Sequence, residues 1–272
     1  MELSTLFDLE SHGPDTFVGI GPRYPWGGLY GGQIVAQSLR AATKTVDAEQ
    51  QVHSLRAYFI RRGDHTEPIR FEVDRIRNGR SFSTRRVVAR QAVGAILNLE
   101  ASFHVPEATA DVQTIQLDRT LPPPDDVLSD AWSDSFDRRT VPAAALTPGH
   151  GQGAGRMAVW MKVTGTLPDD QLLHRCWLAY MSDDIPADAV RAGHPEFNRA
   201  DASDITYTAS LDHSIWFHRP LCADQWHVYD FTSHSYSGAR GLSIGHVFAQ
   251  DGTHVATVAQ EALVRDARRR QD

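Results

Sequence analysis

The segment AQDGTHVATVAQEALVR, near the end of the chain, has one polar side chain where its pattern calls for an apolar one. Ala256, Val258, Gln260, Ala262 and Val264 alternate along it, so a strand places all five on one face. Gln260 is then either a core amide bonded to neighbouring backbone or an edge residue facing water. A buried amide is also suited to hold a water molecule or an oxygen atom. Gln260 is therefore the first candidate for a chemical role.

Asp183 and Ser210 also have types and positions that suit chemistry. Asp183 precedes the segment IPADAVRAG, where it is either the N-cap of a short helix or a carboxylate that can take a proton and orient a nucleophile. Taken alone, the cap is the favoured reading. Ser210 shares one face of the strand TYTASLDHS with Thr206, Thr208 and Asp212, and this polar row favours a solvated hydroxyl.

Other catalytic patterns are missing from the sequence, which has no G-x-S-x-G, C-x-x-C or H-E-x-x-H. His213 and His218 are five apart in a strand, which puts them on opposite faces and disfavours shared metal ligation. Cys176 is expected to be a buried small side chain rather than a nucleophile. The GHGQGAG run at 149–155 lacks a flanking strand and helix, so it indicates a flexible loop rather than a phosphate site.

The elements that must position these residues occur in two similar sets. One set reads HSLRAYFIRRGD, IRNGRSFSTRR and AVGAILNLEASFHVP; the other reads LDHSIWFHRPLCAD, TSHSYSGARG and AQDGTHVATVAQEALVR. Their alternation and turn residues predict an antiparallel meander in each set. A helical period precedes each meander, in GGLYGGQIVAQSLRAATKTV and in LAYMSDDIPADAVRAG, where Ser182 or Asp183 caps the helix and Gly193 ends it. The sequence thus predicts two diverged copies of one α+β unit.

These copies set the predicted domain boundaries. We expect an N-terminal unit over 1–105, a variable connector over 106–155 and a C-terminal unit over 156–272. The connector holds PPPDD, further acids and the glycine run, with no sustained period, and is therefore not expected to contribute to a core.

Composition narrows the class of protein. The 272 residues are 41% hydrophobic and 22% charged, which is typical of a folded globular protein. A formal net charge of -7 disfavours nucleic acid as a partner. The sequence has no apolar run of transmembrane length and acids where a signal peptide has basic residues, so no membrane is expected as a partner. Together with only two cysteines, this favours the cytoplasm.

Several phrases together resemble the thioesterase II (TesB-like) family of acyl-CoA thioesterases. They are GGLYGGQIVAQSL, HSLRAYFIRRGD, RNGRSFSTRRV, LPDDQLLHRCWLAYMSD, SLDHSIWFHRP, GARGL and DGTHVATVAQEALVR. The resemblance covers nearly the whole chain except the connector. It implies a double hotdog fold, in which each half is an antiparallel sheet wrapped around a helix, and hydrolysis of an acyl-CoA thioester to free coenzyme A and a carboxylic acid, as in lipid and fatty acid metabolism.

The resemblance also implies a site. The family's Asp, hydroxyl and Gln fall on Asp183, Ser210 and Gln260, which would hold an attacking water, although Asp184 competes with Asp183 for the inward position. The matching trio is missing from the first copy, where Ser102 stands near the Gln place, so only the second copy is expected to be catalytic. No metal and no cofactor are expected.

Substrate contacts are predicted elsewhere in the chain. Backbone N–H groups at a helix start suit a developing oxyanion, and arginines suit the phosphates of coenzyme A. The candidates are Gly31, Gly32, Gln33, Arg61, Arg80 and Arg86. Two rival functions stay open at this point: a hotdog-type enoyl- or hydroxyacyl-CoA hydratase and a non-catalytic acyl-CoA binding protein. Assembly into a homo-oligomer also stays open.

Overall fold

The computed structural model of the chain describes residues 3–146, 155–198 and 205–267. The chain divides into two compact units that interleave in sequence. The first comprises residues 1–112, 169–181 and 214–217, and the second comprises 113–168, 182–213 and 218–272. Most of the GHGQGAG run lies outside the described residues, so the loop prediction there stays a prediction.

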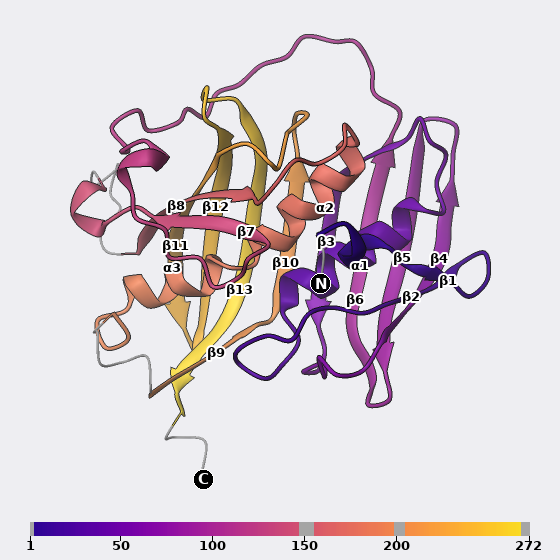
Figure 1. Ribbon diagram of the computed structural model, residues 1–272, viewed down its shortest axis with the longest axis horizontal. Helices are drawn as coiled ribbons and strands as arrows, with labels where there is room; N and C mark the ends of the chain where they lie inside the picture. The colour runs from indigo at the N-terminus through magenta and orange to yellow at the C-terminus, as the bar shows by residue number, and fades with distance from the viewer. Residues whose placement is uncertain (1–2, 147–154, 199–204, 268–272) are drawn as a thin grey trace. The chain divides into compact units, whose positions relative to one another are not determined.

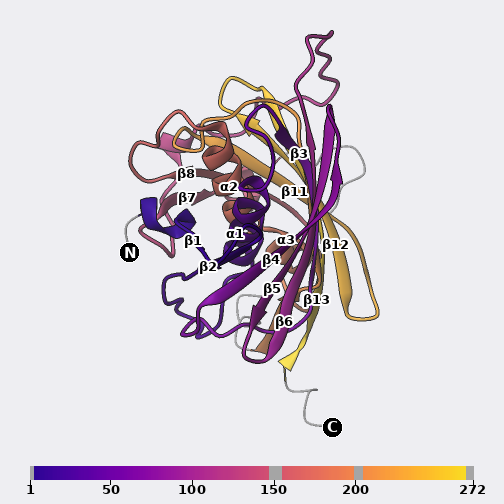
Figure 2. The ribbon, with the colours of Figure 1, turned by 90° about the vertical axis from the view of Figure 1, so that its right-hand side faces the viewer.

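The first unit is an antiparallel sheet with a helix packed on it. Its strand order is β1-β2-β4-β5-β6-β3, and α1 contacts β2 to β6. Figure 2 shows α1 on one side of β4, β5 and β6. The elements are η1 (Leu3–Phe7), β1 (Glu10–Ser11), β2 (Thr16–Gly19), α1 (Gly31–Thr43), β3 (Gln51–Phe59), β4 (Ile69–Asn78), β5 (Phe82–Gln91) and β6 (Gly94–His104). The predicted helix and meander of the first copy are therefore confirmed.

Gly32, near the start of α1, allows a close contact with the helix α2 (Gln171–Ser182), of which residues 171–181 belong to the first unit. A Cβ atom on Gly32 would lie 2.2 Å from the carbonyl oxygen of Tyr180, so no larger residue fits. The Tyr30 hydroxyl donates to the same oxygen over 2.8 Å. Gly32 of the Gly-Gly phrase thus has a packing role that the sequence alone does not reveal.

The second unit is also an antiparallel sheet with a helix on it. The order β13-β12-β11-β8-β7 runs across it, β9 pairs with the other edge of β13, and α3 contacts β8, β9, β11, β12 and β13. The elements are η2 (Pro124–Asp126), β7 (Phe136–Thr140), η3 (Ala143–Ala145), β8 (Arg156–Val163), α3 (Pro186–Gly193), β9 (Thr206–Ser210), β11 (His227–Ser237), β12 (Arg240–Ala249) and β13 (His254–Asp266). β10 (Asp212–Phe217) is divided between the units after His213.

The GARGL phrase forms the turn between β11 and β12 and the contact that follows it. Gly238 and Ala239 both have positive φ, 57° and 62°, as a two-residue hairpin turn of type I′ requires. A Cβ atom on Gly241 would lie 2.1 Å from Cγ1 of Val190, so this glycine lets α3 pack directly on β12. The phrase therefore serves the fold of the unit.

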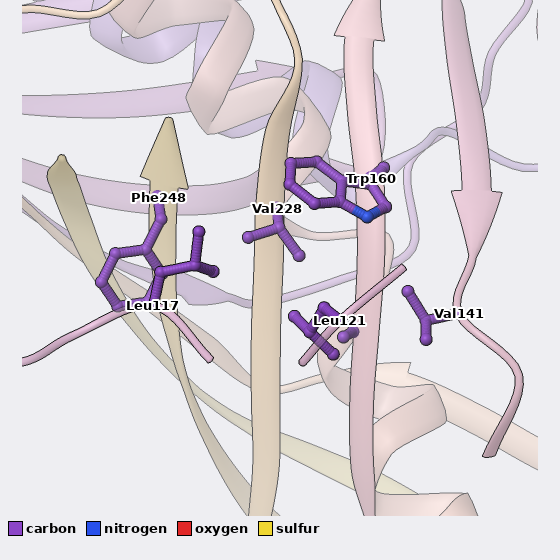
Figure 3. Packing of buried hydrophobic residues seen from close by; sticks show 7 residues of the cluster. Leu117, Leu121, Val141, Trp160, Val228 and Phe248 are labelled. Atoms are coloured by element: carbon purple, nitrogen blue, oxygen red, sulfur yellow. The ribbon is translucent and has the colours of Figure 1, made fainter. Parts of the chain in front are cut away.

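The segment predicted as a connector contributes to the core of the second unit, which corrects the expectation that it stays outside. It supplies β7, and it supplies apolar side chains that cover β8, β11 and β12 (Figure 3). The indole N–H of Trp160 donates to the carbonyl oxygen of Pro122 over 2.9 Å. Isolated apolar residues in a proline-rich stretch have no periodicity, so the pattern did not predict their burial. The buried cluster is Leu117, Leu121, Val141, Ala158, Trp160, Val228 and Phe248.

Two helices replace the single one predicted before the second meander. α3 ends at Gly193 as expected, but its N-cap is Ile185 and neither Ser182 nor Asp183 caps it. Ser182 is instead the last residue of α2, which the pattern did not predict. The sequence contained one signal for α2, the residue Asp170 directly before it. In the structure Asp170 acts as the N-cap, because its Oδ1 accepts from the backbone N–H of Leu172 over 2.9 Å.

Candidate active site

Three of the predicted site residues meet in the second unit. Ser210 is the last residue of β9, Gln260 lies in β13, and Asp183 lies between α2 and α3. The Ser210 hydroxyl donates to Asp183 Oδ1 over 3.0 Å and accepts from Gln260 Nε2 over 2.9 Å. Gln260 is fully buried and Asp183 is 8% exposed. The apolar row predicted around Gln260 is also buried, so the amide is a core residue bonded to side chains.

Ser210 reaches Gln260 because it pairs with Ala262, which lies on the same face of β13 as Gln260, and the strand is interrupted directly after Ser210. β9 ends at Ser210 and β10 begins at Asp212; between them the Leu211 N–H donates to the carbonyl oxygen of Glu261 over 2.9 Å. The Asp212 carboxylate accepts from the Glu261 N–H over 2.7 Å, in place of a backbone acceptor. The predicted polar row therefore stops at Ser210, whose side chain is partly buried and whose hydroxyl bonds to Asp183 and Gln260 rather than to water alone.

His213 joins this network, and sequence reasoning missed it. Its Nδ1 bonds to Gln260 Oε1 and its Nε2 bonds to the Ser182 hydroxyl over 2.9 Å. His213 and Ser182 are both fully buried. The signal was the alternation of β10, in which His213 shares the buried face with Ile215 and Phe217. A lone polar residue in an apolar row singled out Gln260, and the same test applied to β10 would have found His213.

Asp184 lies next to Asp183 but has separate partners. Its carboxylate accepts from Arg138 Nε and from the indole N–H of Trp132, both over 2.6 Å. Arg138 also pairs with Asp130, 2.5 Å away. Of the two neighbouring carboxylates, the one bonded to Ser210 is therefore Asp183.

The predicted substrate contacts all lie in the first unit. Gly31, Gly32 and Gln33 do open α1. The Gln33 side chain is fully buried and accepts from the Tyr24 hydroxyl over 2.8 Å, so its amide is a core group. The three arginines are all exposed: Arg61 donates to the Ala95 carbonyl, Arg86 pairs with Asp74, and Arg80 lies beside the turn between β4 and β5.

Other titratable groups lie apart from the trio. Cys176 is buried, as expected, and burial raises its pKa to about 12, which makes it a poor nucleophile. His218 is exposed while His213 is buried, as the five-residue spacing predicts. Within the described residues, no group of three His, Cys, Asp or Glu side chains is placed to hold a metal ion. No helix there is long and apolar enough to cross a membrane.

The burial of His213 predicts a pH dependence of stability. Desolvation lowers its pKa to about 4, against 6.5 in an unfolded chain. Between these values the unfolded state binds a proton that the folded state does not. Protonation of the unfolded chain therefore does not reduce the free energy of unfolding above pH 6.5, and it reduces that free energy progressively as the pH falls to about 4. We expect a loss of about 3 kcal/mol in the free energy of unfolding over this window. Urea unfolding at a series of pH values measures it, and a His213→Asn variant with the same pH slope would contradict it.

Known acyl-CoA thioesterases have sequences similar to this chain. A family model described as acyl-CoA thioesterase matches residues 130–263, and one described as acyl-CoA thioesterase N-terminal domain matches residues 21–104. Acyl-CoA thioesterase 2 of Haemophilus influenzae is 32% identical over 265 residues, 87% of each chain. The human acyl-coenzyme A thioesterase 8 is 32% identical over 97% of this chain and 88% of its own.

Solved structures agree with these relatives. The acyl-CoA thioesterase II TesB2 of Mycobacterium marinum superposes with a TM-score of 0.86 and 37% identity over 98% of each chain. The tesB protein of Mycobacterium avium superposes with a TM-score of 0.80 and 34% identity over 97% of each chain. The two helix-on-sheet units thus form a double hotdog fold of the α+β class. The chain belongs to the TesB-like acyl-CoA thioesterase II family, and it is a thioester hydrolase.

Proposed function

We propose that the enzyme hydrolyses its acyl-CoA by direct attack of a water molecule held by Asp183, Ser210 and Gln260. The observation that carries this proposal is the pair of hydrogen bonds that joins the three side chains at Ser210 Oγ. Gln260 Nε2 carries a second N–H that can donate to the water, and a carboxylate oxygen can accept more than one hydrogen bond. The carboxylate can accept one proton of the water, the hydroxyl can accept a hydrogen bond from the other, and the amide N–H can donate to the water oxygen.

Each side chain has a distinct role in the reaction. Asp183 takes a proton as the water oxygen bonds to the thioester carbonyl carbon, while Ser210 and Gln260 keep that oxygen in line with the carbonyl. The tetrahedral intermediate collapses with cleavage of the C–S bond. Asp183 returns the proton to the departing sulfur, which leaves coenzyme A as a thiol and the acyl group as a carboxylic acid.

A hydratase using His213 is the weaker alternative. A catalytic imidazole must exchange protons with substrate, whereas both nitrogens of His213 are bonded within the protein and its ring is fully buried. Asp183 and Ser210 are the members of this network that are not fully buried, and of the two Asp183 has the carboxylate suited to a base.

Other roles proposed here rest on the sequence and its resemblance. Backbone N–H groups at Gly31 to Gln33 are the candidates for the oxyanion, and Arg61, Arg80 and Arg86 are the candidates for the phosphates of coenzyme A. A cytoplasmic location, a function in fatty acid metabolism and a homo-oligomeric state are likewise predictions.

A test of the mechanism combines thiol release with isotope labelling. We expect coenzyme A to be released from at least one member of a series of acyl-CoAs of increasing chain length. In H2¹⁸O, the first turnover should place one ¹⁸O atom in the carboxylic acid, and the intact mass of the acid-quenched enzyme should show no acyl adduct. An adduct on Ser210 or Asp183 that forms and decays at the rate of turnover would contradict direct attack by water.

A further inference from the structure

We propose that His213 and Ser182 are positioning residues that orient the Gln260 amide so that its NH2 group faces Ser210. This inference rests on the function proposed for Gln260. The hydrogen bonds run from Ser182 to His213, from His213 to Gln260, from Gln260 to Ser210 and from Ser210 to Asp183. All five residues belong to the second unit.

The charge of Asp183 sets the direction of this chain. A carboxylate only accepts hydrogen bonds, so the Ser210 hydroxyl must donate its one proton to Asp183 Oδ1. Ser210 is then an acceptor toward Gln260, which must present its NH2 group there and its oxygen on the other side.

The tautomer of His213 matches that direction. Gln260 Oε1 can only accept, so Nδ1 of His213 carries the ring proton. Nε2 is then an acceptor for the Ser182 hydroxyl, 2.9 Å away. Burial lowers the pKa of His213 to about 4, which keeps the ring neutral with a single proton at pH 7. With the ring proton on Nδ1, a rotated Gln260 amide would place its NH2 group against the Nδ1–H, donor to donor, so this tautomer of His213 disfavours the wrong orientation.

The network closes on itself through the backbone. Ser182 bonds to His213 in β10, and the next residue, Asp183, bonds to Ser210 at the end of β9. Ser182 and His213 are fully buried, so bulk water does not compete for the hydrogen bond between them. A change at His213 or Ser182 is therefore transmitted to Ser210 through the Gln260 amide.

The first unit contains a related contact without the catalytic residues. His53 stands in the HSLRAYF phrase of β3, as His213 stands in the HSIWF phrase of β10. His53 Nε2 bonds over 2.8 Å to the hydroxyl of Ser102 in β6, the closing strand of that copy. In both units this histidine contacts a polar residue of the closing strand. That residue is Ser102 in the first copy and Gln260 in the second.

The test compares variants that remove or retain the donor to Gln260. His213→Leu should lower kcat about 30-fold with KM changed less than about threefold, because substrate binding does not use the ring. His213→Asn, whose side-chain N–H can replace Nδ1–H, should recover most of kcat. His218→Leu, at an exposed histidine in the same part of the sequence, is the matched control and should leave kcat unchanged.

A double-mutant cycle with Gln260→Ala separates positioning from a general structural role. If His213 acts through Gln260, His213→Leu should have almost no further effect on kcat in the Gln260→Ala background. Effects that multiply would overturn the inference, as would an unchanged kcat in His213→Leu. If His213→Leu does not fold, Ser182→Ala takes its place in the same cycle, with a smaller fall in kcat expected and the same two contrary outcomes.

These results also separate the inference from the function on which it rests. Loss of activity in Asp183→Asn and Gln260→Ala with full activity in His213→Leu would reject the positioning role alone. Full activity in Asp183→Asn and Gln260→Ala would reject the proposed site and the positioning role together.

Discussion

Replacement of Asp183 by asparagine is expected to lower kcat about 10³-fold, the usual scale for loss of a general base. In the wild-type protein Ser210 Oγ donates to Asp183 Oδ1 over 3.0 Å. The asparagine oxygen can accept the same hydrogen bond, so the hydroxyl keeps its position while the base is lost. Substrate affinity should change little, because the carboxylate acts on water. Thiol release under saturating acyl-CoA, with folding checked by circular dichroism, measures the effect.

Asp184→Asn is the matched control for Asp183→Asn. Asp184 pairs with Arg138 and Trp132, so its loss should cost about 2 kcal/mol in the free energy of unfolding while kcat of the folded enzyme stays within a few-fold of wild type. The opposite result, with an inactive Asp184 variant and an active Asp183 variant, would show that the wrong carboxylate has been assigned.

Gln260→Ala is expected to lower kcat about 10²-fold, since it removes the donor to Ser210 and to the attacking water. The alanine also leaves Nδ1–H of His213 without its acceptor, so a loss of stability should accompany the loss of rate. The rate measurement therefore needs a temperature at which urea unfolding shows the variant to be fully folded.

Two further variants sharpen the result for Gln260. Gln260→Glu keeps an acceptor for His213 but has no N–H for Ser210, so it should be nearly as slow as Gln260→Ala. Glu261→Gln changes the neighbouring residue, whose carboxylate pairs with Arg240, and should leave kcat unchanged. A Gln260→Glu variant as fast as wild type would contradict a role for the amide N–H.

The duplicated units account for the expected division of labour. Both copies fold as an antiparallel sheet with a helix on it, and both have a histidine that contacts the closing strand. In the second copy the residue on that strand is a glutamine, Gln260. Its amide donates to the Ser210 hydroxyl, which in turn donates to Asp183. The proposed chemistry therefore depends on a few polar side chains added to a shared framework.

The sequence by itself determined the local structure. Alternating residues predicted the strand β13 and placed Gln260 in an apolar row on one of its faces, and the helical period after Gly-Gly predicted α1. These features depend on residues close together in the chain, because side-chain direction repeats every two residues in a strand and every 3.6 in a helix. The phrases of the second copy also indicated which residue types would form the site.

Only the tertiary structure decided how these residues are used. Asp183 bonds to Ser210, 27 residues away, and Ser210 bonds to Gln260, 50 residues further on. The interruption at Leu211 turns both Ser210 and His213 toward Gln260, although residues three apart in an uninterrupted strand face opposite sides. Strand register and helix ends depend on contacts between distant segments, and periodicity within one segment does not contain that information.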